Sequence, residues 1–117
     1  MAVINGPGSL SAAQTGNGDS TNTVIKNPAT AAILRILNTA GATPTVTINI
    51  LGSINGTDFF NVPYQTVAAP GTIVVAAIVV TTTATNHFYL PAGYGFAYLK
   101  LNYTANTNET ITADLLY

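Results

Sequence analysis

The chain of 117 residues contains no cysteine and no tryptophan, and it has a single histidine. Without cysteine, neither disulfide bonds nor thiolate chemistry contribute to the protein, and the zinc sites built from Cys and His clusters are excluded. Only 6% of the residues are charged, against about a quarter in an ordinary soluble domain. The three basic residues lie far apart in the sequence and the formal net charge is -1. We therefore expect no basic patch of the kind that nucleic acid requires.

Long hydrophobic runs are also missing. The longest, residues 73–80, is less than half of the roughly 20 residues that a membrane-spanning helix needs. The first residues, MAVINGPGSLSAAQ, lack the positive cap and the apolar core of a secretory signal. We expect neither a membrane nor a nucleic acid as a partner.

The clearest pattern in the chain is a strand-turn-strand signal in residues 43–62. Apolar side chains occupy every second position from Val46 to Ile50, which is the period of a strand with one buried face. Asn55 and Gly56 follow, a dipeptide that suits the positive φ angles of a tight turn, and an apolar return strand begins at Phe59. The segment predicts a β-hairpin.

The first 22 residues are rich in glycine, serine, asparagine and threonine, a composition that resists regular structure. We interpret residues 1–22 as an extended arm, either disordered or laid onto a neighbouring subunit with Val3, Ile4 and Leu10 as anchors. Residues 23–117 then form the folded domain, and a chain of this length has no room for a second one.

Further short strands are predicted between turns rich in Gly, Pro and Asn. They cover residues 23–26, 31–38, 72–83, 86–90, 96–103 and 109–117. The segment 72–83, TIVVAAIVVTTT, is dense in β-branched residues but does not alternate. We expect both of its faces to be covered, by a second sheet and loops or by another chain.

Segment 96–103 does alternate. Leu99 and Leu101 are expected in the core, whereas Phe96 and Tyr98 share an outward face with Lys100, a combination enriched at protein interfaces. Seven or eight short strands without a convincing helix predict an all-β fold, a single antiparallel β-sandwich or jelly roll.

Residues for catalysis are few and poorly spaced. No two of the four acidic residues are placed to share a cleft as glycosidases require, and no serine lies in a nucleophile-elbow sequence that would form a triad with His87. Asn55 and Asp58 offer oxygen ligands for calcium, but a single carboxylate binds the ion weakly, so a plain turn is the preferred interpretation. We expect no catalytic residue, no metal site and no cofactor, and a hydrolase is the weakest of the functional alternatives.

A carbohydrate-binding module is a stronger alternative. Such modules stack sugar rings on exposed aromatic side chains, and Tyr89, Tyr94, Phe96 and Tyr98 lie close together in the sequence. The absence of tryptophan and of a nearby carboxylate speaks against this alternative.

The run VTINILGSINGTDFFNV, followed by LPAGYGFAYLKLNYT and ETITADLLY, resembles the small β-sandwich virion proteins of tailed bacteriophages, especially capsid decoration or cement proteins. The resemblance covers roughly residues 44–117 and rests on alternating strands, the N-G-T turn and the late Y-L-K-L-x-Y strand. It implies a structural protein, not an enzyme, that binds the major capsid protein on the outer surface of the virion capsid and reinforces the shell. A homo-oligomer, dimer or trimer, is expected, and a tail or fibre module that binds host glycans is the alternative.

The sequence supplies a set of candidate contact residues for such a role. They are Val3, Ile4, Leu10, Asn55, Asp58, Tyr94, Phe96 and Tyr98.

Overall fold

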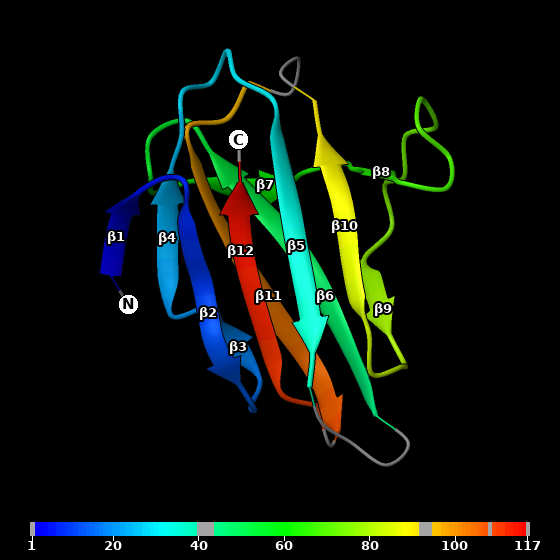
Figure 1. Ribbon diagram of the computed structural model, residues 1–117. Coiled ribbons are helices and arrows are strands. Elements are labelled where there is room, and N and C mark those ends of the chain that lie inside the picture. The colour runs from blue at the N-terminus through cyan, green and yellow to red at the C-terminus, as the bar shows by residue number, and fades with distance from the viewer. Residues whose placement is uncertain (1, 40–43, 92–94, 108, 117) are drawn as a thin grey trace.

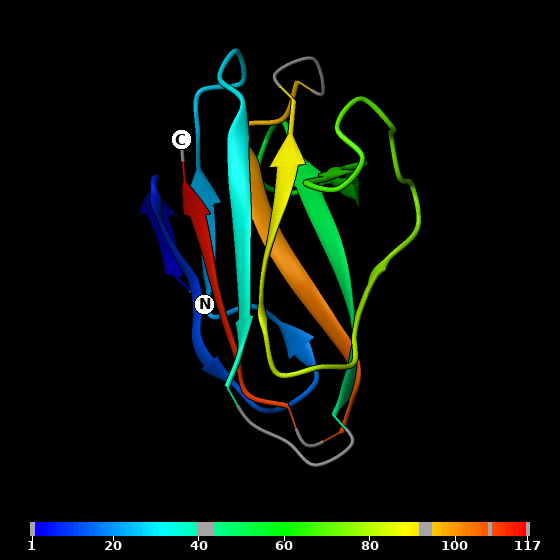
Figure 2. The same cartoon turned by 45° about the vertical axis from the view of Figure 1, so that its right-hand side comes forward.

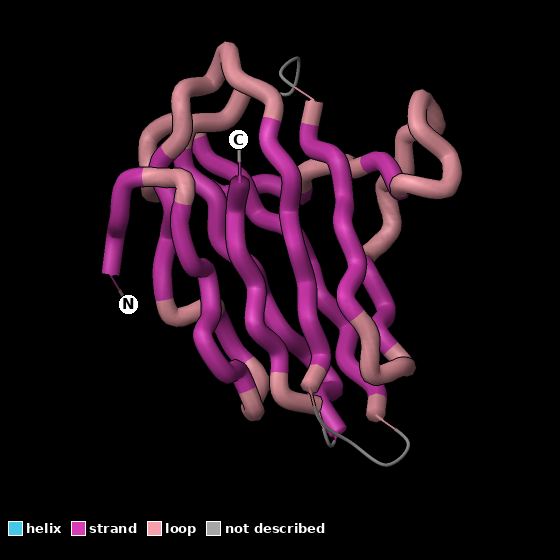
Figure 3. The backbone as a smooth tube through the Cα atoms, viewed as in Figure 1, coloured by secondary structure: helices cyan, strands magenta, loops and turns pink. Residues whose placement is uncertain are grey.

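The structure is a computed structural model of the chain, and it describes residues 2–39, 44–91, 95–107 and 109–116. Two sheets lie face to face, and the described residues form twelve strands and no helix (Figures 1 and 3). Neighbouring strands are antiparallel throughout, except that β1 runs parallel to β4. The prediction of an all-β sandwich is therefore confirmed.

The first sheet is built around the pairing of its two longest strands, β6 and β11. Its order is β1-β4-β11-β6-β7, with β3 also beside β11 and β9 also beside β6. The strands are β1 (Ala2–Asn5), β3 (Gly18–Asp19), β4 (Asn22–Ile25), β6 (Thr45–Ser53), β7 (Phe59–Asn61), β9 (Ile78–Val80) and β11 (Tyr98–Thr107).

The second sheet has the order β2-β12-β5-β10-β8. Its strands are β2 (Gly8–Gln14), β5 (Ala32–Asn38), β8 (Gln65–Thr66), β10 (Thr85–Leu90) and β12 (Ile111–Leu116). Burial alternates residue by residue along β5 and β12, because each of these strands has one face on the core and one on the surface.

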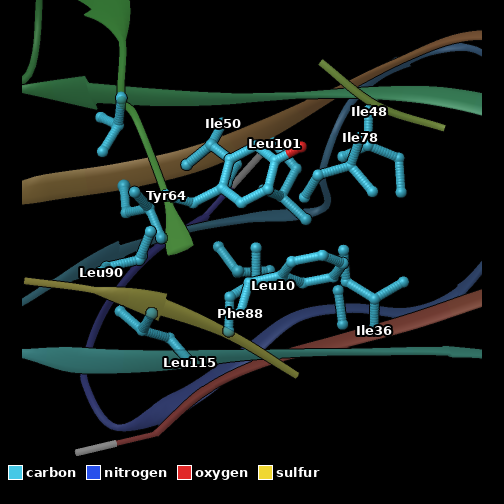
Figure 4. Packing of buried hydrophobic residues seen from close by; sticks show 14 of the residues in the cluster. Leu10, Ile36, Ile48, Ile50, Tyr64, Ile78, Phe88, Leu90, Leu101 and Leu115 are labelled. Carbon is cyan, nitrogen blue, oxygen red and sulfur yellow. The ribbon is translucent and has the colours of Figure 1, made fainter. Parts of the chain in front are cut away.

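A single core fills the space between the sheets (Figure 4). Ile48 and Ile50 from β6 and Leu101 from β11 face Ile36 and Leu115 from the opposite sheet. The predicted hairpin is confirmed, since β6 pairs with β7 and its alternating stripe is buried. Aligned sheets with interdigitating inner side chains are the usual packing of a β-sandwich.

The N-terminal residues are a correction to the predicted arm, because they belong to the sandwich. β2 pairs with β12 at the edge of the second sheet, and β1 pairs with β4 at the edge of the first. Leu10 is 0% exposed, and Ser11 meets the Tyr103 hydroxyl at 3.1 Å inside the molecule. A sequence rich in glycine and serine has little strand propensity of its own, but backbone pairing and one buried leucine decide its conformation here.

Segment 72–83 also differs from its prediction. Only Ile78–Val80 forms a strand, β9, and this strand pairs with β6 at the edge of the first sheet. Val79 therefore faces outward, and Ile73 and Val75 precede the strand in an exposed connection. The β-branched run signals extended backbone, but its two faces are not both covered.

Phe96 is a further correction, because it is 1% exposed and lies in the core. The chain reaches β11 only at Tyr98, so the alternation of the strand does not extend back to Phe96. Backbone bonds from Ala97 to Ser53 and from Lys26 to Ala97 hold the bend, and Lys26 lies 4.7 Å from the centre of the Phe96 ring.

A buried carboxyl group ties together the connections at one end of the sandwich. Glu109 is 2% exposed, and its Oε1 accepts a hydrogen bond of 2.9 Å from Nδ2 of Asn38. The same amide donates to the carbonyl of Thr82 at 3.1 Å, and its Oδ1 accepts from the backbone of Thr110. Burial raises the pKa of Glu109 to about 7, because the charged form loses its water.

Truncation of Leu10 tests whether the N-terminal strand belongs to the folded domain. We expect Leu10→Ala to lower the free energy of unfolding by about 3 kcal/mol, because it opens a cavity in the core. Val3→Ala is the matched control, since Val3 lies on β1 with 59% of its surface exposed, and it should change stability little. Urea unfolding followed by circular dichroism measures both. If the two variants unfold with equal free energies, residues 1–22 form an arm that is separate from the folded domain.

The raised pKa of Glu109 predicts a stability that falls with rising pH. Below about 4.5, the ordinary value, the carboxyl is protonated in both folded and unfolded chains. Between that value and about 7, the carboxyl is ionised in the unfolded chain but still protonated in the folded chain. The free energy of unfolding therefore falls by roughly 3 kcal/mol over this range. Urea unfolding should show this loss for the natural chain and not for Glu109→Gln. The exposed Asp58→Asn is the control, and an equal pH dependence in all three proteins would contradict the assignment.

Candidate interaction surfaces

The loop between β6 and β7, residues 54–58 and here named the tip loop, is shaped by its own side chains. Oδ1 of Asn55 accepts backbone hydrogen bonds from Thr57 and Asp58, both at 2.9 Å, and Nδ2 of Asn55 donates to Oδ2 of Asp58 at 3.1 Å. An asparagine that bonds the backbone two residues ahead is a standard way to fix a turn. Asn55 and Asp58 therefore hold the loop in one shape.

Gly56 lets the tip loop lie against the first sheet. Its φ of 80° lies in the left-handed region, and a Cβ atom there would approach the ring of Tyr98 to 3.2 Å. A side chain at this position would be strained by the backbone conformation and crowded by the Tyr98 ring. Three of the sequence-predicted contact residues, Asn55, Asp58 and Tyr98, are consequently brought to one place at the end of β6.

Apolar side chains flank the tip loop. Ile54 is 73% exposed and Phe60, on β7, is 40% exposed. Together with Asn55 and Asp58 they line a shallow hollow of about 220 Å³. Large apolar groups around a polar turn give a surface suited to contact with another protein.

Charges beside the tip loop are paired within the chain. Nζ of Lys100 lies 3.0 Å from Oδ2 of Asp19 and 4.2 Å from the centre of the Phe59 ring. The hydrogen bond from Asn102, followed by the hydrogen bond and charge of Lys100, holds the pKa of Asp19 below its ordinary value. On the outer face of the other sheet, Arg35 forms an ion pair with Asp114. Both pairs leave little free charge on the surfaces around them.

A second exposed apolar region is the connection between β8 and β9, residues 67–77, here named the side loop. In both ribbon views it stands away from the sheets beyond β9 and β10 (Figures 1 and 2). Three large apolar side chains in it and one on β9 are more than half exposed, namely Val67, Ile73 and Val75 of the loop and Val79 of the strand. No Asp, Glu, Lys or Arg occurs anywhere between residues 59 and 99. The side loop is therefore an uncharged apolar surface.

Hydrogen bonds and packing hold the base of the side loop. Tyr64 and Val74 exchange backbone hydrogen bonds of 3.0 and 2.8 Å, and the side chain of Gln65 accepts one from Gly71 at 3.0 Å. The Tyr64 ring meets Phe88 edge-on, with 5.3 Å between centroids, and burial raises the pKa of its hydroxyl. These contacts fix the base of the side loop, and its large apolar side chains face outward.

The remaining predicted contact residues are scattered. Val3 is exposed on β1, Ile4 is partly buried against the core, and Leu10 and Phe96 are fully inside, while Tyr94 lies outside the described residues. The proposed aromatic cluster is dispersed as well, since Tyr89 is on β10 in one sheet and Tyr98 on β11 in the other. Its described members do not form a stacking platform.

For the uncharged β-branched run that leads through the side loop into β9, the sequence predicted cover on both faces, by a second sheet and loops or by another chain. Within this chain, the structure leaves Ile73, Val75 and Val79 exposed. His87 lies exposed on β10, directly opposite Arg35 on β5. The part of the chain that the structure describes contains no cluster of three or more potential metal-ligating His, Cys, Asp or Glu residues. No helix in that part is suited to span a membrane.

Comparisons with known proteins give a likeness of fold. No family model matches the chain, and no curated protein matches its sequence. Among solved structures, it is similar to the crystal structure of SPBc2 prophage-derived protein YomS, with a TM-score of 0.67 and 8% sequence identity. The match covers 92% of this chain and 88% of that chain. The two chains thus share a fold over nearly their whole lengths.

Proposed function

We propose that this chain is a structural protein of a bacteriophage virion, a capsid decoration protein that binds the outer surface of the shell. In this role it contacts the major capsid protein and joins neighbouring capsid subunits. Its task is mechanical, so binding surfaces and a rigid fold are what the chain must supply.

The observation that carries the proposal is the presence of two separate exposed apolar surfaces on one sandwich. The tip loop lies against Tyr98 of β11. The side loop leads into β9, which pairs with β6 on the side opposite β11. A protein that joins two neighbours needs two contact surfaces held at a constant separation. A sandwich with one continuous core supplies that separation.

The sparse charge of the chain supports the same role. Both ion pairs described above lie within the chain, and apart from Asp58 the tip loop and the side loop carry apolar or uncharged polar side chains. Such surfaces give little electrostatic steering, but they associate well when many copies bind a symmetric shell at once. The likeness of fold to a prophage-derived protein supports a phage setting.

The tip loop is the surface that we assign to the shell. Its shape is fixed before binding by Asn55 and Gly56, so little conformational freedom is lost on contact. Ile54 and Phe60 supply the apolar area, and the hollow between them can receive one side chain of the shell.

Binding of tip-loop variants to empty heads tests the proposal. Heads assembled from the major capsid protein of the same phage, without this chain, are mixed with purified protein and pelleted. We expect the natural chain to pellet with the heads and Ile54→Asp to bind about tenfold more weakly or worse, because a charge replaces an apolar contact. Leu116→Asp is the matched control, since Leu116 is an exposed leucine on the other sheet, and it should bind like the natural chain.

Two results would contradict this function. The first is natural protein that stays in solution while heads pellet. The second is labelled protein found on tails rather than heads in images of complete virions, which would favour the tail or fibre alternative.

A further inference from the structure

The edge of the second sheet is incompletely covered beside the side loop. β8 has two residues and pairs with β10 only at Phe88 and Tyr89. The first half of β10, residues 85–87, extends past the end of β8 and is exposed. Residues 85–87 therefore have no paired residue on β8.

The backbone of this edge points outward. The carbonyl of Ala84 accepts a hydrogen bond from Asn38 at the end of β5. Because successive residues of an antiparallel strand direct their N–H and C=O groups to alternate sides, Thr85 and His87 direct theirs away from β5. Of these two residues, Thr85 lies further beyond the last pair of the β8 ladder, which is Phe88 with Thr66.

A hollow lies along the open edge. Its volume is about 450 Å³, and its lining includes Val67 and Ala68 of the side loop on one side and Thr85 and His87 of β10 on the other. Val67 and Ala68 directly follow β8, so the hollow lies beside the end of that strand, where a further extended segment would add to the sheet. Strand addition of this kind satisfies backbone groups and places alternate side chains on the adjoining surface.

Natural sheets protect such edges, but this one is unprotected. β2, at the other edge of the same sheet, has two register shifts against β12, and bulges of this kind discourage further pairing. Residues 85–87 keep a regular register with β5 and carry no Asp, Glu, Lys or Arg. An unprotected edge next to exposed apolar side chains is a surface that a partner covers.

The side loop itself offers a matching edge. Val74 is bonded to Tyr64 through both its N–H and its C=O, so Ile73 and Val75 direct their backbone groups to the other side, away from Tyr64. Their side chains are exposed, that of Val75 to 80%. The chain thus has a short apolar strand segment and an open strand edge on the same side of the molecule.

We propose that this side of the sandwich is the interface of a symmetric dimer, in which residues 73–75 of each copy pair with residues 85–87 of the other. A twofold axis makes the two contacts identical, so both edges of both copies are covered at once. The partner is a second copy because its surface carries the same uncharged apolar groups and the same extended segment. A charged partner would find no opposite charge between residues 59 and 99.

The dimer would explain how the chain joins two capsid subunits, but dimerisation itself does not depend on the decoration role. Two tip loops, one from each copy, would face two capsid subunits, and the paired sheets would join them. Self-association is measured on the purified protein alone. Failure of dimerisation therefore leaves head binding by the tip loop untouched, and the reverse also holds.

Sedimentation velocity over a range of micromolar concentrations tests the dimer. We expect the natural chain to sediment as a species of twice its 12.0 kDa mass. Val75→Lys should dissociate it by about tenfold or more in affinity, because two like charges enter one interface. Val3→Lys introduces the same side chain at an exposed position on β1 and should leave the dimer unchanged. A monomeric natural chain, a dimeric Val75→Lys or a species that grows beyond two copies would overturn the proposal.

Cysteine crosslinking tests the pairing itself. The chain has no cysteine, so a disulfide formed on oxidation reports only on introduced residues. A mixture of Val75→Cys and Thr85→Cys proteins should give a crosslinked pair that contains one chain of each. A mixture of Val3→Cys and Thr85→Cys should give none. A dimer that forms without the first crosslink would contradict this strand pairing.

Discussion

The antiparallel pairing of β6 with β11 is the contact on which the rest of the sandwich depends. These two strands are the longest in the molecule and supply Ile48, Ile50 and Leu101 to the core. β4 and β3 attach to one side of the pair, and β7 and β9 attach to the other. The tip loop begins and ends on this framework, and the side loop joins β8 of the other sheet to β9 of this one. Their separation is therefore set by a close-packed core and not by the loops themselves.

The scarcity of charge also determines the character of the surface. Arg35 with Asp114 and Lys100 with Asp19 form pairs within the chain, so they contribute little net field to the surface. Outward positions on β6 and β11 are instead filled largely by Thr and Asn. Such a surface is neutral and weakly protected against association. Exposed apolar loops, and not charged patches, are therefore the distinctive features of this surface.

The local sequence pattern predicted the strands correctly wherever one face of a strand packs against the core. The stripe from Val46 to Ile50, the alternation of Leu99 and Leu101 and the turn at Gly56 all have local physical causes, since strand period and backbone φ act over a few residues. The turn at the tip of the hairpin was predicted for the same reason. Fold class followed from the number of such segments and the lack of any helical period.

By itself, the amino-acid sequence determined the strands with alternating faces, the hairpin turn and the absence of charge between residues 59 and 99. Tertiary structure decided the rest. Leu10 became a core residue because β2 covers the edge of β12, and Phe96 became one because the chain bends before β11. The side loop is exposed because β9 lies at a sheet edge with no second layer outside Val79. Each of these outcomes depends on partners far away in the chain, which a local pattern does not contain.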